Sequence, residues 1–145
     1  MNDEEIRNSI DVSLRNELFE KVREIHNAPY ARLNGIDIIS IKQDEVCTKM
    51  SLEGKINSIG FAHGAATFAI ADHTFAFASN LWSERQTALS CNIVYHRPGI
   101  GKELTAVSSK ISETRSVSVY SIAVHCDGKH IATATCIGFK IKDKK

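Results

Sequence analysis

The chain has 145 residues and a mass of 16.0 kDa, a length that fits one domain with a sizeable hydrophobic core and argues against a second domain. Its 18 Lys and Arg residues nearly balance 17 Asp and Glu residues, and the formal net charge of +1 argues against a nucleic-acid-binding surface. The longest weakly polar stretch, residues 59–82, contains His63, Asp72, His73 and Asn80, which argues against a membrane span.

The first predicted element is an amphipathic helix over residues 12–26, where apolar residues recur at mostly helical spacing among charges until Ala28-Pro29 ends the pattern. Residues 36–52 alternate apolar and polar side chains around Gln43–Glu45, which is typical of two strands joined by a turn. A loop rich in Gly and Asn follows over 54–60, and an apolar helix is predicted over about 64–82. Four β-type runs come next, covering about 87–96, 102–113, 116–126 and 130–142.

The last two runs should be antiparallel neighbours, because Asp127-Gly128 between them is a strong hairpin signal. One face of the final run carries only small side chains, at Ala132, Ala134, Cys136 and Gly138, so another element can approach it closely. These elements predict an α+β fold, in which an antiparallel sheet of about six strands curls around one long apolar helix. We expect residues 1–27 to form a helical extension and residues 28–145 to form the domain.

One acidic residue stands out in the apolar helix. Ala, Phe and Ile occupy every side of the helical wheel around Asp72, and a helix that is apolar all round is expected to be buried. Burying an unpaired carboxylate costs several kcal/mol, so such a group usually has a shifted pKa, a dedicated partner or a chemical role. Asp72 is therefore the first candidate for an active residue, the alternative being an interface salt bridge.

The segment Asn57-Ser-Ile-Gly-Phe-Ala-His63-Gly64-Ala65, with Asp72 nine residues after the histidine, resembles the hotdog-fold acyl-CoA thioesterases of the phenylacetic-acid-degradation (PaaI-like) branch. The resemblance extends over residues 28–141, and one departure is that Ala65 occupies the position of the family's second glycine. It implies a hotdog dimer with active sites at its interface, often paired again into a tetramer. The expected substrate is an aryl- or medium-chain acyl-CoA, and no separate cofactor is expected because CoA is part of the substrate.

The candidate site residues follow from the chemistry of thioester hydrolysis, which needs a carboxylate to attack the carbonyl carbon or activate water, and a donor for the oxyanion. Asp72 suits the first role, and the backbone N–H of Gly64 at a helix start suits the second. His63 and Asn57 would shape or polarise the loop before the helix. No His or Cys spacing predicts a metal site.

Three further residues are weaker candidates for binding the substrate. His73 and Thr74 follow Asp72, and polar positions at a subunit contact would explain them equally well. Arg115 is a candidate for the CoA phosphates because family members resemble this chain in carrying basic residues between the corresponding strands; ordinary surface charge is the alternative.

The spacing of the two main candidates predicts a shared site. Gly64 and Asp72 are eight positions apart, which is about 12 Å along a helix, whereas one carbonyl must lie roughly 3 Å from each group. We therefore expect a homodimer in which Asp72 of one protomer faces Gly64 of the other. A non-catalytic acyl-CoA-binding hotdog module is the alternative, since it would need the pocket and not the acid. Four cysteines without a CxxC pair, and a beginning unlike a signal peptide, predict a cytoplasmic protein.

Overall fold

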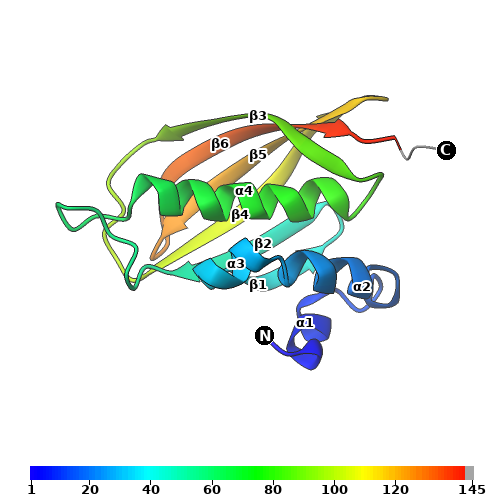
Figure 1. The fold of residues 1–145 in the computed structure, drawn as a ribbon, viewed down its shortest axis with the longest axis horizontal. Coiled ribbons are helices and arrows are strands. Elements are labelled where there is room, and N and C mark those ends of the chain that lie inside the picture. Colours follow the sequence, from blue (N-terminus) through cyan, green and yellow to red (C-terminus); the bar gives the residue numbers. More distant parts are fainter. Residues whose placement is uncertain (143–145) are drawn as a thin grey trace.

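The computed structural model describes residues 1–142, and Figure 1 shows one long helix packed against one curved sheet. In chain order the elements are α1 (Asp3–Ser9), α2 (Arg15–His26), α3 (Pro29–Asn34), β1 (Asp37–Lys42), β2 (Glu45–Ser51), α4 (Gly64–Asn80), β3 (Gln86–Tyr95), β4 (Glu103–Glu113), β5 (Val117–Cys126) and β6 (Lys129–Lys140). The predicted α+β fold, with its central helix and six strands, is confirmed.

The six strands form one antiparallel sheet in the order β1-β2-β4-β5-β6-β3. The predicted hairpin between β5 and β6 is confirmed, and its turn residues Asp127 and Gly128 have φ angles of 44° and 83°. Asp44 in the β1–β2 turn has a φ of 56°, a conformation that Asp tolerates better than most residues. Turn chemistry therefore fixes the register of both hairpins.

Helix α4 fills the hollow of the sheet because its inner face is apolar and the strands opposite offer small residues. Gly138 on β6 is the tightest example: a Cβ at this position would lie 3.1 Å from Phe75 Cζ and 3.2 Å from Ser118 Oγ. A hydroxyl pair, Thr48 on β2 and Thr74 on α4, joins helix and sheet at 2.7 Å within the core. The small face predicted for the last strand is thus the one that receives the helix.

The N-terminal region departs from prediction in two places. Helix α1 was not expected, although Asn2 and Glu5 form a capping box that starts it. The predicted helix over 12–26 begins later, at Arg15, and Pro29 both follows that helix and opens α3. Proline suits a first helical position because its missing N–H has no partner there in any case.

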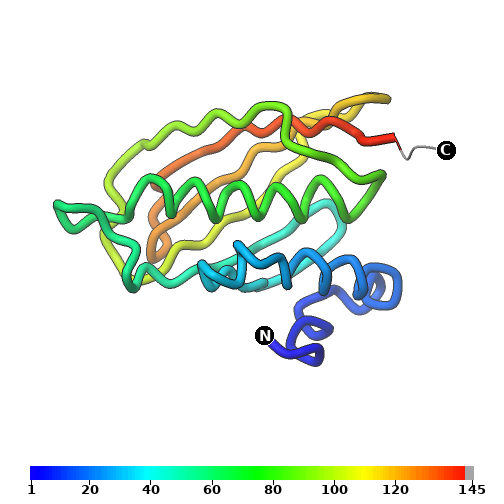
Figure 2. Tube along the Cα trace, in the orientation of Figure 1, coloured from blue at the N-terminus to red at the C-terminus, as the bar shows by residue number. Residues whose placement is uncertain are grey.

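All three N-terminal helices lie on the β1 side of the molecule, as Figures 1 and 2 show. Buried Ile6, Leu18 and Val22 of α1 and α2 belong to the same hydrophobic cluster as the residues between α4 and the sheet. The predicted extension 1–27 therefore packs on the domain core, while residues 143–145 of the predicted domain lie outside the described part.

The two edge strands differ in their surroundings. The β1 edge is covered by the segment after α1, where Asp11 N–H donates to Ile41 C=O at 2.9 Å. The β3 edge has no such cover within residues 1–142, and Leu89, Val94 and Tyr95 on this strand are at least half exposed. An open apolar edge strand is a typical surface for pairing with another chain.

Candidate active site

Asp72 lies on the one face of α4 that the sheet does not cover. This face carries Ala65, Phe68, Asp72 and Ala76 at spacings of three and four residues, and all four are exposed or partly exposed. The expectation of a helix buried on every side is therefore wrong for the single chain. The inner face is buried as predicted, but the outer stripe, although apolar around its single acid, has no cover among residues 1–142.

The carboxylate of Asp72 has no hydrogen bond or ion pair with any of the described residues, and the polar side-chain contacts of α4 are made by other residues. Its side chain lies in a hollow of about 500 Å³ lined by Tyr30, Ala65, Phe68, Ala69, Asp72 and Tyr95, which we call the Asp72 hollow. Partial desolvation by these mostly apolar neighbours raises the pKa of Asp72 above its ordinary value of 3.8, although the side chain is still exposed in the single chain. A carboxylate with a raised pKa is a better base than an ordinary one.

Gly64 is the first residue of α4, as predicted, and His63 is its N-cap. His63 Nδ1 accepts the backbone N–H of Ala65 at 3.0 Å, so its imidazole caps the helix and its Nε2 is left for other partners. The N–H of Gly64 has no partner within residues 1–142. The positive end of the helix dipole lies behind this N–H, which makes it an available donor to a developing oxyanion.

Asn57 organises the loop that leads into the helix. Its side-chain Oδ1 accepts hydrogen bonds from the backbone N–H groups of Ile59 at 3.1 Å and Phe61 at 3.0 Å. The backbone N–H of Asn57 donates to Phe61 C=O at 2.7 Å. The loop needs Gly60 because its φ of 85° is unfavourable for other residues. Asn57 therefore acts as a shaping residue of the loop before Gly64.

A second hollow, of about 550 Å³, surrounds the start of α4, and we call it the Gly64 hollow. Its walls are Asn57, Phe61, Ala62, Gly64, Ala65, Thr67, Tyr95, His96, Arg97, Pro98, Gly99 and Ile131. The structure thus brings Asn57 and Gly64 together in one hollow and places Asp72 in the other. The two hollows share Ala65 and Tyr95.

The sequence profile of the "Thioesterase superfamily" matches residues 59–133, which is more than half of the chain and includes Gly64, Asp72 and all of α4. The chain belongs to the thioesterase superfamily. The acyl-coenzyme A thioesterase PaaI of Escherichia coli K12 is 32% identical over 100 residues, which cover 68% of this chain and 71% of the relative. The resemblance found in the sequence is thereby confirmed.

Solved structures give the same result. The E. coli PaaI structure superposes with a TM-score of 0.78 at 27% identity, covering 87% of this chain and 92% of the other. A mutant of the phenylacetic acid degradation protein PaaI from Thermus thermophilus superposes with a TM-score of 0.73 at 28% identity, covering 79% of this chain and 100% of the other. The hotdog fold and thioester hydrolysis as the class of reaction follow from these similarities.

The structure places neither His73 nor Thr74 of this thioesterase in the two hollows, so within one chain neither side chain lines the candidate site. Both are buried, and Thr74 Oγ1 donates to Ile70 C=O at 2.7 Å besides its contact with Thr48. Burial, and then the charge of Arg32, lowers the pKa of His73 to about 4. Both side chains point into the core because they lie on the inner face of α4.

Arg115 is exposed in the turn between β4 and β5 and lines neither hollow. This turn lies at the end of the sheet where α4 ends, away from the start of the helix (Figure 1). The neighbouring Ser116 C=O accepts the N–H of Lys140 at 2.9 Å, which ties the turn to the end of β6. Within one chain the structure therefore gives Arg115 no contact with the candidate site.

Tyr30 and Tyr95 of the thioesterase were not predicted as site residues, although both line the Asp72 hollow. They come from α3 and β3, and their approach to α4 is a tertiary contact that no local pattern reveals. The one available signal was the run of small residues on β6, since Tyr95 pairs with Ala132 in the sheet register. Small neighbours on one strand leave room for a large side chain on the next.

No three His, Cys, Asp or Glu side chains within residues 1–142 gather where they could hold a metal ion. No helix in the same range is both long and apolar enough to cross a membrane.

Proposed function

We propose that this thioesterase hydrolyses acyl-CoA to the free acid and CoA, with Asp72 as nucleophile or general base and Gly64 N–H as oxyanion donor. The proposal rests mainly on Asp72, an acid without a partner among residues 1–142, which lies in a hollow walled by apolar side chains and has a raised pKa. The PaaI relative, named as an acyl-coenzyme A thioesterase, supports the choice of CoA as the leaving group.

In the hydrolytic step an oxygen attacks the thioester carbonyl carbon and the carbonyl oxygen becomes negative. The new C–O bond forms to Asp72 itself or to a water that Asp72 deprotonates, and both routes use the same carboxylate. Collapse of the tetrahedral intermediate breaks the C–S bond, and the CoA thiolate leaves. In the water route it takes up the proton that Asp72 has accepted, and the free acid is the other product. In the direct route the other product is a mixed anhydride on Asp72, and a water then hydrolyses this anhydride, which releases the free acid, restores the carboxylate and supplies the proton for the thiolate. The Gly64 N–H stabilises the oxyanion, which is where an aligned donor has its largest effect.

We further propose a homodimer in which each site combines Asp72 of one protomer with Gly64 and His63 of the other. The exposed apolar stripe of α4 and the open β3 edge support a partner on this side of the chain. The separation of Gly64 and Asp72 along one helix supports a site completed by a second copy. Pairing of two such dimers into a tetramer remains part of the proposal.

The CoA phosphates need local positive charge, and we propose Arg97 as their first contact in preference to Arg115. Arg97 follows β3 and lines the Gly64 hollow, whereas Arg115 lies outside it. No separate cofactor is required by this chemistry. A cytoplasmic location is also part of the proposal and is supported by four cysteines that form no disulfide.

The first test is the Asp72→Asn variant, assayed for CoA release with a thiol-reactive dye. We expect hydrolysis to fall by about 10³-fold or more, because the amide can neither attack nor accept a proton. The oligomer and its melting temperature should be retained, since Asp72 has no structural partner among residues 1–142. Full turnover by Asp72→Asn would end the assignment, and tight binding of acyl-CoA without thiol release by the wild type would favour the non-catalytic binding module.

The second test separates a shared site from a site within one chain. Gly64→Pro removes the proposed donor while keeping a residue that suits the first helical position, and Gly64→Ala is the matched control that keeps the N–H. A Cβ at Gly64 would lie 3.4 Å from Tyr95 Oη, an ordinary contact, so Gly64→Ala should fold and retain turnover.

Neither Gly64→Pro nor Asp72→Asn should be active alone. After the two inactive variants are unfolded and refolded together, half of the dimers are mixed, and each mixed dimer holds one intact site, so about a quarter of wild-type activity should return. Sites built within one chain would give no recovery.

A further inference from the structure

Tyr95 is the last residue of β3, and its position is fixed by the sheet. It pairs with Ala132 of β6, whose side chain is fully buried on the side that faces α4. The Tyr95 ring accordingly reaches toward the start of that helix. A Cβ built on Gly64 would lie 3.4 Å from Tyr95 Oη and 3.5 Å from Cζ, so the ring rests directly on the first residue of α4.

The hydroxyl of Tyr95 adds a directional contact to this packing. Tyr95 Oη donates to the backbone C=O of Gly64 at 3.1 Å. The same residue, Gly64, presents the N–H that is proposed to stabilise the oxyanion. The N–H and the C=O of Gly64 belong to neighbouring peptide units joined at its Cα, so a hydrogen bond to the carbonyl restrains the residue that carries the N–H.

The ring of Tyr95 also lies between the two hollows. Asn57 and Arg97 line only the Gly64 hollow, while Tyr30 and Asp72 line only the Asp72 hollow. Tyr95 and Ala65 alone line both, and Ala65 contributes no more than a methyl group. Most of the wall between the two hollows is thus the Tyr95 side chain, which is 50% exposed in the single chain.

We propose that Tyr95 is the residue that determines which acyl chains this thioesterase accepts, by closing the passage between the Gly64 hollow and the Asp72 hollow. A short acyl group fits on one side of the ring, and a longer chain would have to pass through it. The hydroxyl has a second, positioning role through the Gly64 carbonyl. This inference rests on the site proposed above and adds to it a residue that sets chain length.

The test uses acyl thioesters of N-acetylcysteamine, which carry no nucleotide, so acyl selection is measured apart from CoA recognition. Tyr95→Ala should open the passage, and the kcat/KM ratio of the dodecanoyl to the hexanoyl thioester should rise at least about tenfold, the scale of one added methylene contact in an apolar pocket. Ile111→Ala, an exposed apolar residue on β4 that lines neither hollow and lies away from the β3 edge, is the control and should keep the wild-type ratio. Should Tyr95→Ala fail to fold, Tyr95→Leu removes the ring with less loss of volume.

Tyr95→Phe separates the two roles, because it keeps the ring and removes only the hydroxyl. Its chain-length ratio should match the wild type, while kcat should fall by about two- to tenfold with little change in KM, the loss expected of one hydrogen bond. An unchanged ratio in folded Tyr95→Ala and Tyr95→Leu would overturn the specificity role. An unchanged kcat in Tyr95→Phe would overturn the positioning role.

Failure of the proposed function would look different from failure of this inference. A wild type that cleaves the N-acetylcysteamine thioesters but no acyl-CoA would contradict the CoA assignment and leave the chain-length ratio measurable. If Tyr95→Ala is folded but inactive, binding of alkyl-CoA thioethers, which cannot be hydrolysed, decides the matter. Dodecyl-CoA should then gain affinity over hexyl-CoA relative to the wild type, and equal gains would overturn the proposal.

Discussion

His63 illustrates how one side chain at the site can have a structural and a chemical role together. Its Nδ1 caps α4 by accepting the N–H of Ala65, so His63→Ala leaves that N–H without its partner. We expect the variant to lose about 1 kcal/mol of stability in urea unfolding, the typical cost of a lost N-cap. Hydrolysis should also fall, because the loop and the Gly64 peptide lose their anchor.

The control for His63 is His63→Asn, because Asn is a strong N-cap residue that lacks an imidazole. If the cap is all that His63 provides, His63→Asn should restore both the stability and the activity lost in His63→Ala. If the imidazole polarises the substrate through its remaining nitrogen, only the stability should return. Activity in His63→Ala equal to that of the wild type would remove His63 from the site.

At the residue scale, the main candidates that the sequence predicted share one segment. Asn57, His63, Gly64 and Asp72 were chosen because their spacing along the chain is itself the signal. Tyr30 and Tyr95 were missed because α3 and β3 meet α4 only in the folded chain. The exposure of Asp72 was also mispredicted, since a helical wheel cannot tell a face covered by the same chain from one left for another.

At the scale of elements, strands and the long helix were predicted to within a few residues because their patterns are long and regular. The short helices α1 and α3 were missed, as each has fewer than eight residues and depends on its cap. The capping box of Asn2 and Glu5 indicates the start of α1. Pro29 indicates the start of α3, and Gly35, with a φ of 64°, ends that helix. Capping residues and proline therefore start helices in this protein, as glycine ends one.

The packing of α4 on β6 depends on the absence of a side chain at Gly138. Gly138→Ala would add a methyl group about 3.1 Å from Phe75 Cζ and 3.2 Å from Ser118 Oγ, and it would also press on Gln86, which accepts a hydrogen bond from Ser118. We expect a loss of roughly 1–3 kcal/mol in urea unfolding, because an inserted methyl group in a tight core forces its neighbours to shift. Thr135→Ala, exposed on the same strand, is the control and should change stability little. A Gly138→Ala variant as stable as the wild type would show that α4 can move away from β6 without cost.

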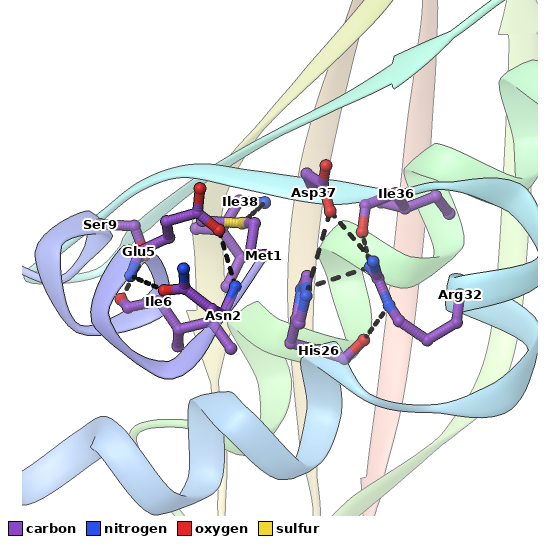
Figure 3. Close-up of polar contacts among 10 residues, drawn as sticks. All are labelled: Met1, Asn2, Glu5, Ile6, Ser9, His26, Arg32, Ile36, Asp37 and Ile38. Carbon is purple, nitrogen blue, oxygen red and sulfur yellow. Dashed lines mark hydrogen bonds and ion pairs between the residues drawn. The ribbon is translucent and has the colours of Figure 1, made fainter.

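At the scale of the whole molecule, a partly buried polar cluster joins the N-terminal helices to the domain. Figure 3 shows Arg32 of α3 donating to Asp37 of β1 at 3.0 Å and to the C=O of His26, the last residue of α2, at 2.6 Å. Arg32 also donates to Ile36 C=O. His26 is fully buried, and its Nε2 lies 3.9 Å from Asp37 Oδ1 without a hydrogen bond among residues 1–142. A second positive charge in this cluster, on a protonated His26 beside Arg32, would therefore be unfavourable.

Both buried histidines of this region are held neutral. Burial lowers the pKa of His26 from its ordinary 6.5 to about 4, with Arg32 and the N-terminal amino group adding to the effect and Asp37 opposing it. The pKa of His73 on α4 is likewise lowered to about 4 by burial, Arg32 and His26. The unfolded chain binds protons at these histidines near pH 6.5, whereas the folded chain binds them only near pH 4. Stability is therefore complete above about pH 6.5 and falls as the pH drops toward 4.

We predict that each of these two histidines costs about 2 kcal/mol of stability between pH 7 and pH 5, as measured by urea unfolding at the two pH values. Carboxylates also begin to bind protons as the pH falls, so the loss of unfolding free energy between pH 7 and pH 5 is compared between variants and the wild type. His26→Gln and His73→Gln should each be less stable at pH 7 yet lose less stability on acidification than the wild type, and the double variant should lose least. Thr135→Ala, exposed on β6 and without a titrating group, is the control and should keep the wild-type pH dependence. If the variants of His26 and His73 also kept the wild-type pH dependence, acid would act on this protein elsewhere.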